Sequence, residues 1–149
     1  MKEIILKPHE ILQASHVGIM RQTENLKKSA KAAYGAGADK DWQLHVEGAM
    51  GECALAKFLN IYWPGKGDMR GPDAGIVDVR TRSKHHYELI LHERDPDDRK
   101  FWLLTGWNGT YRIHGYILGK DGKKKEYWKD PAGGRPAFFV PQSALRMDL

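Results

Sequence analysis

The stretch Pro72-Asp73-Ala74-Gly75-Ile76-Val77-Asp78-Val79-Arg80-Thr81-Arg82 combines a short apolar strand with regularly spaced charges. Side chains two residues apart in an extended strand point to the same face. Asp78 and Arg80 are therefore expected to share one face, while the residues that alternate with them face the other way. Charges on an otherwise apolar strand are costly to bury, so they indicate a site for a metal ion or a phosphate.

Two helices are predicted upstream of this strand, over residues 8–31 and 41–60, from apolar residues at helical spacing. Gly48 and Gly51 lie within the second helix, where a glycine otherwise costs about 1 kcal/mol, so they predict close packing against another element. Glu52 follows Gly51 beside the apolar stripe, and a solvated position and a functional one are about equally favoured. Glu47 is expected on a solvated face.

Downstream, residues of high strand propensity recur with a period near two. Strands are predicted at residues 75–82, 87–93, 101–107, 110–118 and 137–140. Asn108-Gly109 predicts a two-residue hairpin, residues 94–99 a loop, and residues 120–129 a loop with a short helix ending at Tyr127-Trp128. The predicted fold class is α+β, with N-terminal helices followed by a mixed, mostly antiparallel sheet.

The 149 residues are expected to form a single domain, with residues 1–40 as a helical extension and 41–149 as the core. A net charge of +5 is compatible with a polyanionic partner without requiring one. The lone Cys53 excludes an intramolecular disulfide framework and is interpreted as a small core residue. No apolar run is long enough to span a membrane, and the N-terminus is a poor signal peptide, so a cytoplasmic location is expected.

Phosphodiester cleavage needs an activated water and neutralisation of the charge on the phosphate, and carboxylate-held divalent ions supply much of this. Asp73 and Asp78, with Glu52 arriving from the helix, are the predicted ligands of Mg²⁺ or Mn²⁺, which prefer oxygen. Arg80 beside them is predicted to orient water or to bind the scissile phosphate.

These residues resemble the motif of the PD-(D/E)XK, or restriction-endonuclease-like, nucleases. Pro72-Asp73 is similar to the PD element and Asp78-Val79-Arg80 to the (D/E)XK element, while Glu52 is similar to the acidic residue on the first core helix of that superfamily. The resemblance implies a restriction-endonuclease-like core and a metal-dependent DNA nuclease with Glu52, Asp73, Asp78 and Arg80 as catalytic residues. The whole chain, above all residues 131–142, also resembles small uncharacterised phage and prophage proteins, which implies the cytoplasm of a bacterial host.

The chain departs from the superfamily at Arg80, where lysine is usual. A buried lysine can lose its proton and help to activate water, whereas arginine stays charged. An alternative is therefore a catalytically inactive relative that binds DNA or a host protein. A homodimer also stays open.

Basic residues around the motif are predicted to contact DNA phosphates. They are Arg82, Lys84, Lys123, Lys124 and Lys125. His85-His86 is interpreted as a solvated turn, with a phosphate contact as the alternative, and His114 is expected to have a structural role. The sequence lacks the nucleotide-binding motifs Gly-x-x-x-x-Gly-Lys-[Ser/Thr] and Gly-x-Gly-x-x-Gly.

Overall fold

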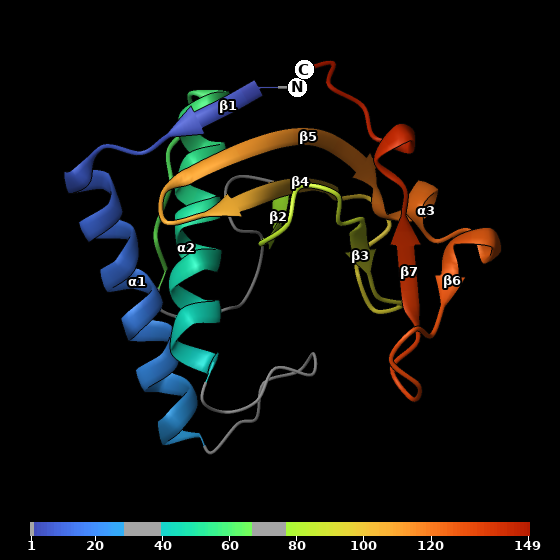
Figure 1. Cartoon of the computed structure of the whole chain (residues 1–149), viewed down its shortest axis with the longest axis horizontal. Coiled ribbons are helices and arrows are strands. Elements are labelled where there is room, and N and C mark those ends of the chain that lie inside the picture. The colour runs from blue at the N-terminus through green and yellow to red at the C-terminus, as the bar shows by residue number, and fades with distance from the viewer. Residues whose placement is uncertain (1, 29–39, 67–76) are drawn as a thin grey trace.

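The computed structural model describes residues 2–28, 40–66 and 77–149. In chain order the helices and strands are β1 (Lys2–Ile5), α1 (Pro8–Lys27), α2 (Asp41–Leu59), β2 (Val77–Arg82), β3 (Leu89–Leu91), β4 (Lys100–Trp107), β5 (Thr110–Leu118), α3 (Gly119–Gly122), β6 (Trp128–Lys129) and β7 (Ala137–Val140). Single 3-10 turns cover Lys125–Tyr127 and Gln142–Ala144. The chain is α+β, with the two long helices ahead of most of the strands, as the sequence predicts (Figure 1).

The strands form two sheets. The main sheet has the order β1-β5-β4-β2, in which β2 runs parallel to β4 and the other neighbours are antiparallel. The small sheet has the order β3-β7-β6 and is antiparallel. The prediction of a mixed, mostly antiparallel arrangement is therefore confirmed.

The β4–β5 hairpin turns at Asn108-Gly109, as predicted. The two residues have φ angles of 53° and 94°, and consecutive positive values match the twist that a two-residue hairpin requires. Glu47 of α2 accepts hydrogen bonds from the backbone N–H of Asn108 and from the hydroxyl of Tyr111. Glu47 is only half-buried, but its carboxylate also has a structural role, because it ties α2 to the hairpin.

Glycines allow close approach of the helices to their neighbours. A Cβ atom built on Gly18 of α1 would lie 2.5 Å from the Cα atom of Val46 in α2. One built on Gly51 of α2 would lie 1.9 Å from Oγ1 of Thr81 in β2. The predicted close packing is confirmed at Gly51. It is wrong at Gly48, where no neighbouring atom of the described residues, beyond the adjoining turns of its own helix, lies within 4 Å of an added Cβ.

The main sheet buries both of its sides, with different partners. On the helix side, Val77, Val79 and Trp102 pack with Leu55 of α2. On the small-sheet side, Phe101, Leu103 and Ile117 pack with three buried residues of the small sheet, namely Leu89, Leu91 and Val140. Burying a side chain of this size contributes about 1.5–3 kcal/mol relative to leaving it exposed. Figure 1 shows the result, with α1 and α2 at one end of the main sheet and β3, β7 and β6 at the other.

Two short strands were not predicted. β1 pairs with β5 at the edge of the main sheet, and β6 pairs with β7 in the small sheet. Both strands are short and mostly exposed, so their side chains do not alternate between buried and exposed positions. Backbone hydrogen bonds define them, and the sequence gives no sign of these. Trp128 accordingly begins β6 instead of ending a helix. Residues 1–40, expected as an extension, supply β1 to the main sheet and α1 to the helical layer.

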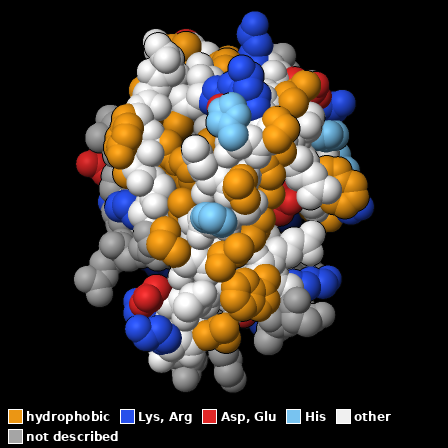
Figure 2. All heavy atoms as spheres, turned by 90° about the vertical axis from the view of Figure 1, so that its left-hand side faces the viewer, with side chains coloured by type: hydrophobic (Ala, Val, Ile, Leu, Met, Phe, Trp, Pro, Cys, Tyr) orange, Lys and Arg blue, Asp and Glu red, His pale blue; other side chains and the backbone are white. Residues whose placement is uncertain are grey.

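The outer face of α1 keeps several large apolar side chains exposed. Leu12, Ile19 and Leu26 repeat every seven residues along it and are 60%, 44% and 59% exposed. Figure 2, which looks at this side of the molecule, shows hydrophobic side chains gathered over it. The structure describes a single chain, so the homodimer stays a prediction.

Candidate functional site: the charged side of strand β2

Strand β2 separates its charged residues from its apolar ones in the predicted way. Asp78 lies opposite Phe101 and Arg80 opposite Leu103 in the parallel register with β4, so both charged residues occupy the small-sheet side. Val77 and Val79 belong to the core on the helix side. The shared face of Asp78 and Arg80 is therefore confirmed.

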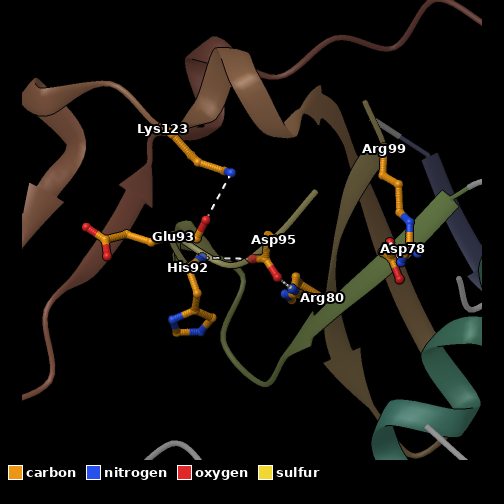
Figure 3. A network of polar contacts seen from close by, with 7 residues as sticks. All are labelled: Asp78, Arg80, His92, Glu93, Asp95, Arg99 and Lys123. Carbon is orange, nitrogen blue, oxygen red and sulfur yellow. Dashed lines mark hydrogen bonds and ion pairs between the residues drawn. The ribbon is translucent and has the colours of Figure 1, made fainter. Parts of the chain in front are cut away.

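Asp78 is a nearly buried carboxylate whose ionic partner is Arg99. The residue is 6% exposed, and Nη1 of Arg99 donates a hydrogen bond to its Oδ2 atom over 3.3 Å. Burial raises the pKa of Asp78 because desolvation outweighs the opposing effect of Arg99. The charged form of this carboxylate is therefore incompletely stabilised by the protein. Figure 3 shows Arg99 and Asp78 side by side.

Arg80 belongs to a neighbouring ion pair. Its Nη2 atom donates to Oδ1 of Asp95 over 2.9 Å, and its guanidinium lies 5.0 Å from the ring centre of Phe101. The other oxygen of Asp95 accepts the backbone N–H of His92 over 2.7 Å. Figure 3 shows how the loop before β4 presents Asp95 to β2. Arg80 and Arg99 thus bring two cations to the same side of the main sheet as Asp78.

Glu52 lies in the helical layer, away from this cluster. Two guanidinium nitrogens of Arg21 donate to its carboxylate over 2.6 and 2.9 Å, and Nε1 of Trp63 donates over 3.2 Å. Glu52 is 6% exposed, so Arg21 and Trp63 enclose it between α1 and α2. Since α2 covers the helix side and Asp78 faces the small-sheet side, the structure does not bring Glu52 and Asp78 together.

The sequence held a signal for this separation. A helix that packs on β2 buries the apolar face of the strand, which carries Val77 and Val79. A carboxylate on that helix is then screened by the sheet from Asp78. Asp73 lies outside the described residues, so its pairing with Asp78 stays a prediction. Within residues 2–28, 40–66 and 77–149 there is no group of three or more His, Cys, Asp or Glu side chains that could hold a metal ion.

The five predicted DNA contacts divide into two groups. Arg82 donates to the carbonyl of Glu88 over 2.9 Å and stacks 4.1 Å from the ring centre of Tyr87. Lys123 donates to the carbonyl of Glu93 and to Asp97, over 3.1 and 2.7 Å. These two cations hold loops in place. The other three, Lys84, Lys124 and Lys125, are exposed to solvent, and the ammonium of Lys124 lies 5.9 Å from the ring centre of Tyr127.

Several residues of this surface were missed in the sequence. Arg99 and Asp95 lie in a stretch whose composition predicts a polar loop. Only the alternating charges beside Pro96 indicate that these residues could form ion pairs. Thr105, a buried residue of β4, carries no signal, because a threonine in an apolar strand is typical of the sheet itself. Cys53, as expected, is a poor nucleophile, since burial raises the pKa of its thiol to about 11.

No helix in the described part of the chain is long and apolar enough to cross a membrane. Comparison with known proteins gives no family model, curated protein or solved structure that matches this chain.

Proposed function

We propose that this chain acts on DNA as a metal-dependent phosphodiesterase with a restriction-endonuclease-like core, centred on Asp78. The observation that supports it best is the placement of Asp78 and Arg80 on one side of β2, next to a second cation, Arg99. A carboxylate that holds a metal ion, with cations that meet the phosphate beside it, is the minimum that such chemistry needs.

The environment of Asp78 suits a divalent cation. Its carboxylate is buried, its pKa is raised, and the guanidinium beside it is at the long end of hydrogen-bonding distance. A small divalent ion would stabilise the charged carboxylate more effectively than Arg99 does. Asp78 would hold Mg²⁺ or Mn²⁺, together with Asp73 as the sequence predicts, and a bound ion activates water and offsets phosphate charge.

Arg80 and Arg99 would then contact the phosphate. Their side chains are 28% and 30% exposed, so an anion can reach both guanidinium groups. Each is now engaged with a carboxylate, and a DNA phosphate would compete for the same planar donors. Glu52 has no part in this proposal, because Arg21 neutralises it in the helical layer.

A second candidate is a protein of the same fold that binds DNA without cutting it. The ion pair between Arg80 and Asp95 favours this alternative, because it fixes a permanently charged side chain where lysine is usual in the superfamily. Arginine cannot accept a proton from water, so any base would have to come from elsewhere. Both candidates predict DNA binding, and they differ in cleavage.

The test is an incubation of supercoiled plasmid and single-stranded DNA with the full-length chain, in Mg²⁺, in Mn²⁺ and in EDTA. We expect cleavage with metal, none with EDTA, and at least a hundredfold slower cleavage by Asp78→Asn, in line with the loss of a group that acts in the transition state. Asp98→Asn is the matched control, because Asp98 is an exposed carboxylate in the same loop as Arg99. Binding without cleavage under every metal condition would establish the second candidate instead.

A further inference from the structure

A buried hydroxyl joins two histidines at the far end of the charged side of the main sheet. Oγ1 of Thr105, in β4, lies 2.7 Å from Nδ1 of His85 and 2.6 Å from Nε2 of His114. Thr105 is completely buried, whereas His85 is exposed and His114 is partly exposed. The two rings, which are 29 positions apart in the sequence, therefore meet through one hydroxyl group.

The turn that carries His85 is held in place from outside. Nε2 of Gln142 donates to the carbonyl oxygens of His85 and Tyr87, over 2.7 and 2.9 Å. His86, the next residue, instead packs its ring against Tyr87, with ring centres 4.9 Å apart. The two adjacent histidines thus have different ring contacts, because the ring of His85 meets Thr105 and that of His86 meets Tyr87.

Proton counting assigns the direction of the hydrogen bonds. A hydroxyl has one proton to donate, so one ring nitrogen must accept it while the other donates. Burial, with the nearby charges of His85 and Arg112, lowers the pKa of His114, which keeps that ring neutral. When the ring of His85 is charged, both of its nitrogens donate, so Thr105 accepts Nδ1–H of His85 and donates its own proton to Nε2 of the neutral His114. Nε2–H of His85, on an exposed side chain, is then the ring donor that can meet an anion.

Basic residues outnumber acidic ones around His85. Arg112 and Arg82 both lie opposite Thr105, in β5 and β2, and Lys84 precedes His85 in the turn. The acidic side chains nearby are Glu3, which lies opposite Arg112 in β1, and Glu88, which is paired with Lys129 over 3.8 Å. The guanidinium of Arg82 stacks on the ring of Tyr87. Lys84 and Arg112 are therefore the cations that can bind an anion together with His85.

We propose that His85, backed by Thr105 and His114 and flanked by Lys84 and Arg112, is a second phosphate-binding site for DNA. This inference rests on the proposed function. Arg82, which pairs with Thr105, lies four positions after Asp78 in β2, and four steps along a strand span about 13 Å. B-DNA rises about 3.4 Å per nucleotide along each strand, so the two sites contact phosphates several nucleotides apart. Histidine binds phosphate strongly only in its charged form, so we expect DNA binding at this site to be tighter at acidic pH.

The experiment measures binding of a short DNA duplex in EDTA by fluorescence anisotropy, at pH 6.0 and pH 8.0. We expect roughly tenfold tighter binding by the wild type at pH 6.0, the value of one charge-assisted contact. His85→Asn removes this difference, and His86→Asn, the matched control in the same turn, keeps it. Thr105→Val reduces it, with thermal unfolding used to confirm that the variant is folded. An unchanged pH difference in His85→Asn overturns the inference.

Inorganic phosphate separates this inference from the proposed function. We expect phosphate to shift the ring resonances of His85 and not those of His86 in NMR spectra, in wild type and in Asp78→Asn alike. If phosphate does so while the chain neither binds nor cleaves DNA, the site binds phosphate but has no role in DNA binding, and the proposed function fails. If DNA is cleaved through Asp78 while His85 is unaffected by phosphate and by DNA, the inference alone fails.

Discussion

Glu52 and Arg21 form a buried ion pair that joins the two long helices. Both side chains are less than a tenth exposed, and the contact is bidentate. Removing one partner of such a pair leaves an uncompensated buried charge, whereas replacing both by apolar residues is often neutral. In this account the pair serves the fold, so its loss should affect stability first.

Glu52→Gln is therefore expected to lower the free energy of unfolding by about 3–5 kcal/mol, because Arg21 keeps its charge and loses its partner. Urea unfolding of the variant measures this loss. The double variant Arg21→Met, Glu52→Met should recover most of the lost stability. Equal stabilities of wild type and Glu52→Gln would show that the pair contributes nothing to the fold.

Asp78 should behave in the opposite way. Its raised pKa means that the folded state binds the proton of Asp78 more tightly than the unfolded state does. This group therefore stabilises the fold most when the pH is below its pKa in the unfolded chain, near 3.9. The contribution is lost as the pH rises through its pKa in the folded protein. Asp78→Asn should thus be more stable than wild type at pH 7, and the gap should close towards pH 4. Urea unfolding at both pH values tests this, with the exposed Asp98→Asn as the control. A less stable Asp78→Asn at pH 7 would contradict it.

At the scale of elements, the α2–β2 contact sets which side of the strand meets the helix. Gly51 lets α2 approach Thr81 so closely that a methyl group does not fit, whereas Gly48, one turn earlier, has open space beside it. Both glycines lie in α2 and carry the same intrinsic cost of glycine in a helix. Comparing substitutions at the two positions therefore isolates the effect of the close contact with β2.

Gly51→Ala is expected to destabilise the protein by about 1–3 kcal/mol through overpacking against β2. Gly48→Ala should instead stabilise it by about 0.5–1 kcal/mol, because alanine has the higher helix propensity. Thermal unfolding of both variants gives the two signs directly. Stabilisation by Gly51→Ala would mean that α2 is not held against Thr81.

The sequence predicted the long elements well because their side-chain periodicity is strong. Both helices, the hairpin and the faces of Asp78 and Arg80 follow from it. It did not predict β1 and β6, which depend on backbone pairing, nor the partner of Glu52, since a helical pattern does not reveal that Arg21 lies across from it. The link from His85 through Thr105 to His114 was equally hidden, because it joins three separate elements.

For the whole molecule, the net charge of +5 is relevant to DNA only through the cations that remain exposed. The combined variant Lys84→Ala, Lys124→Ala, Lys125→Ala should lower the slope of log affinity against log salt by about 2 to 3, at about 0.9 per phosphate contact. A control with the same loss of charge is Lys27→Ala, Lys28→Ala, Lys40→Ala, whose residues are exposed near the ends of α1 and α2. Equal slopes in the two triple variants would place DNA elsewhere.

The central claim is that the reactive centre lies at Asp78, on the side of the main sheet opposite Glu52. The measurement that tests it most directly is the rate of Mn²⁺-dependent plasmid cleavage by Asp78→Asn and by Glu52→Gln, at a temperature where both variants are folded. The account predicts that Asp78→Asn loses cleavage and that Glu52→Gln keeps most of it. Loss of cleavage in a folded Glu52→Gln, or full cleavage by Asp78→Asn, would contradict it.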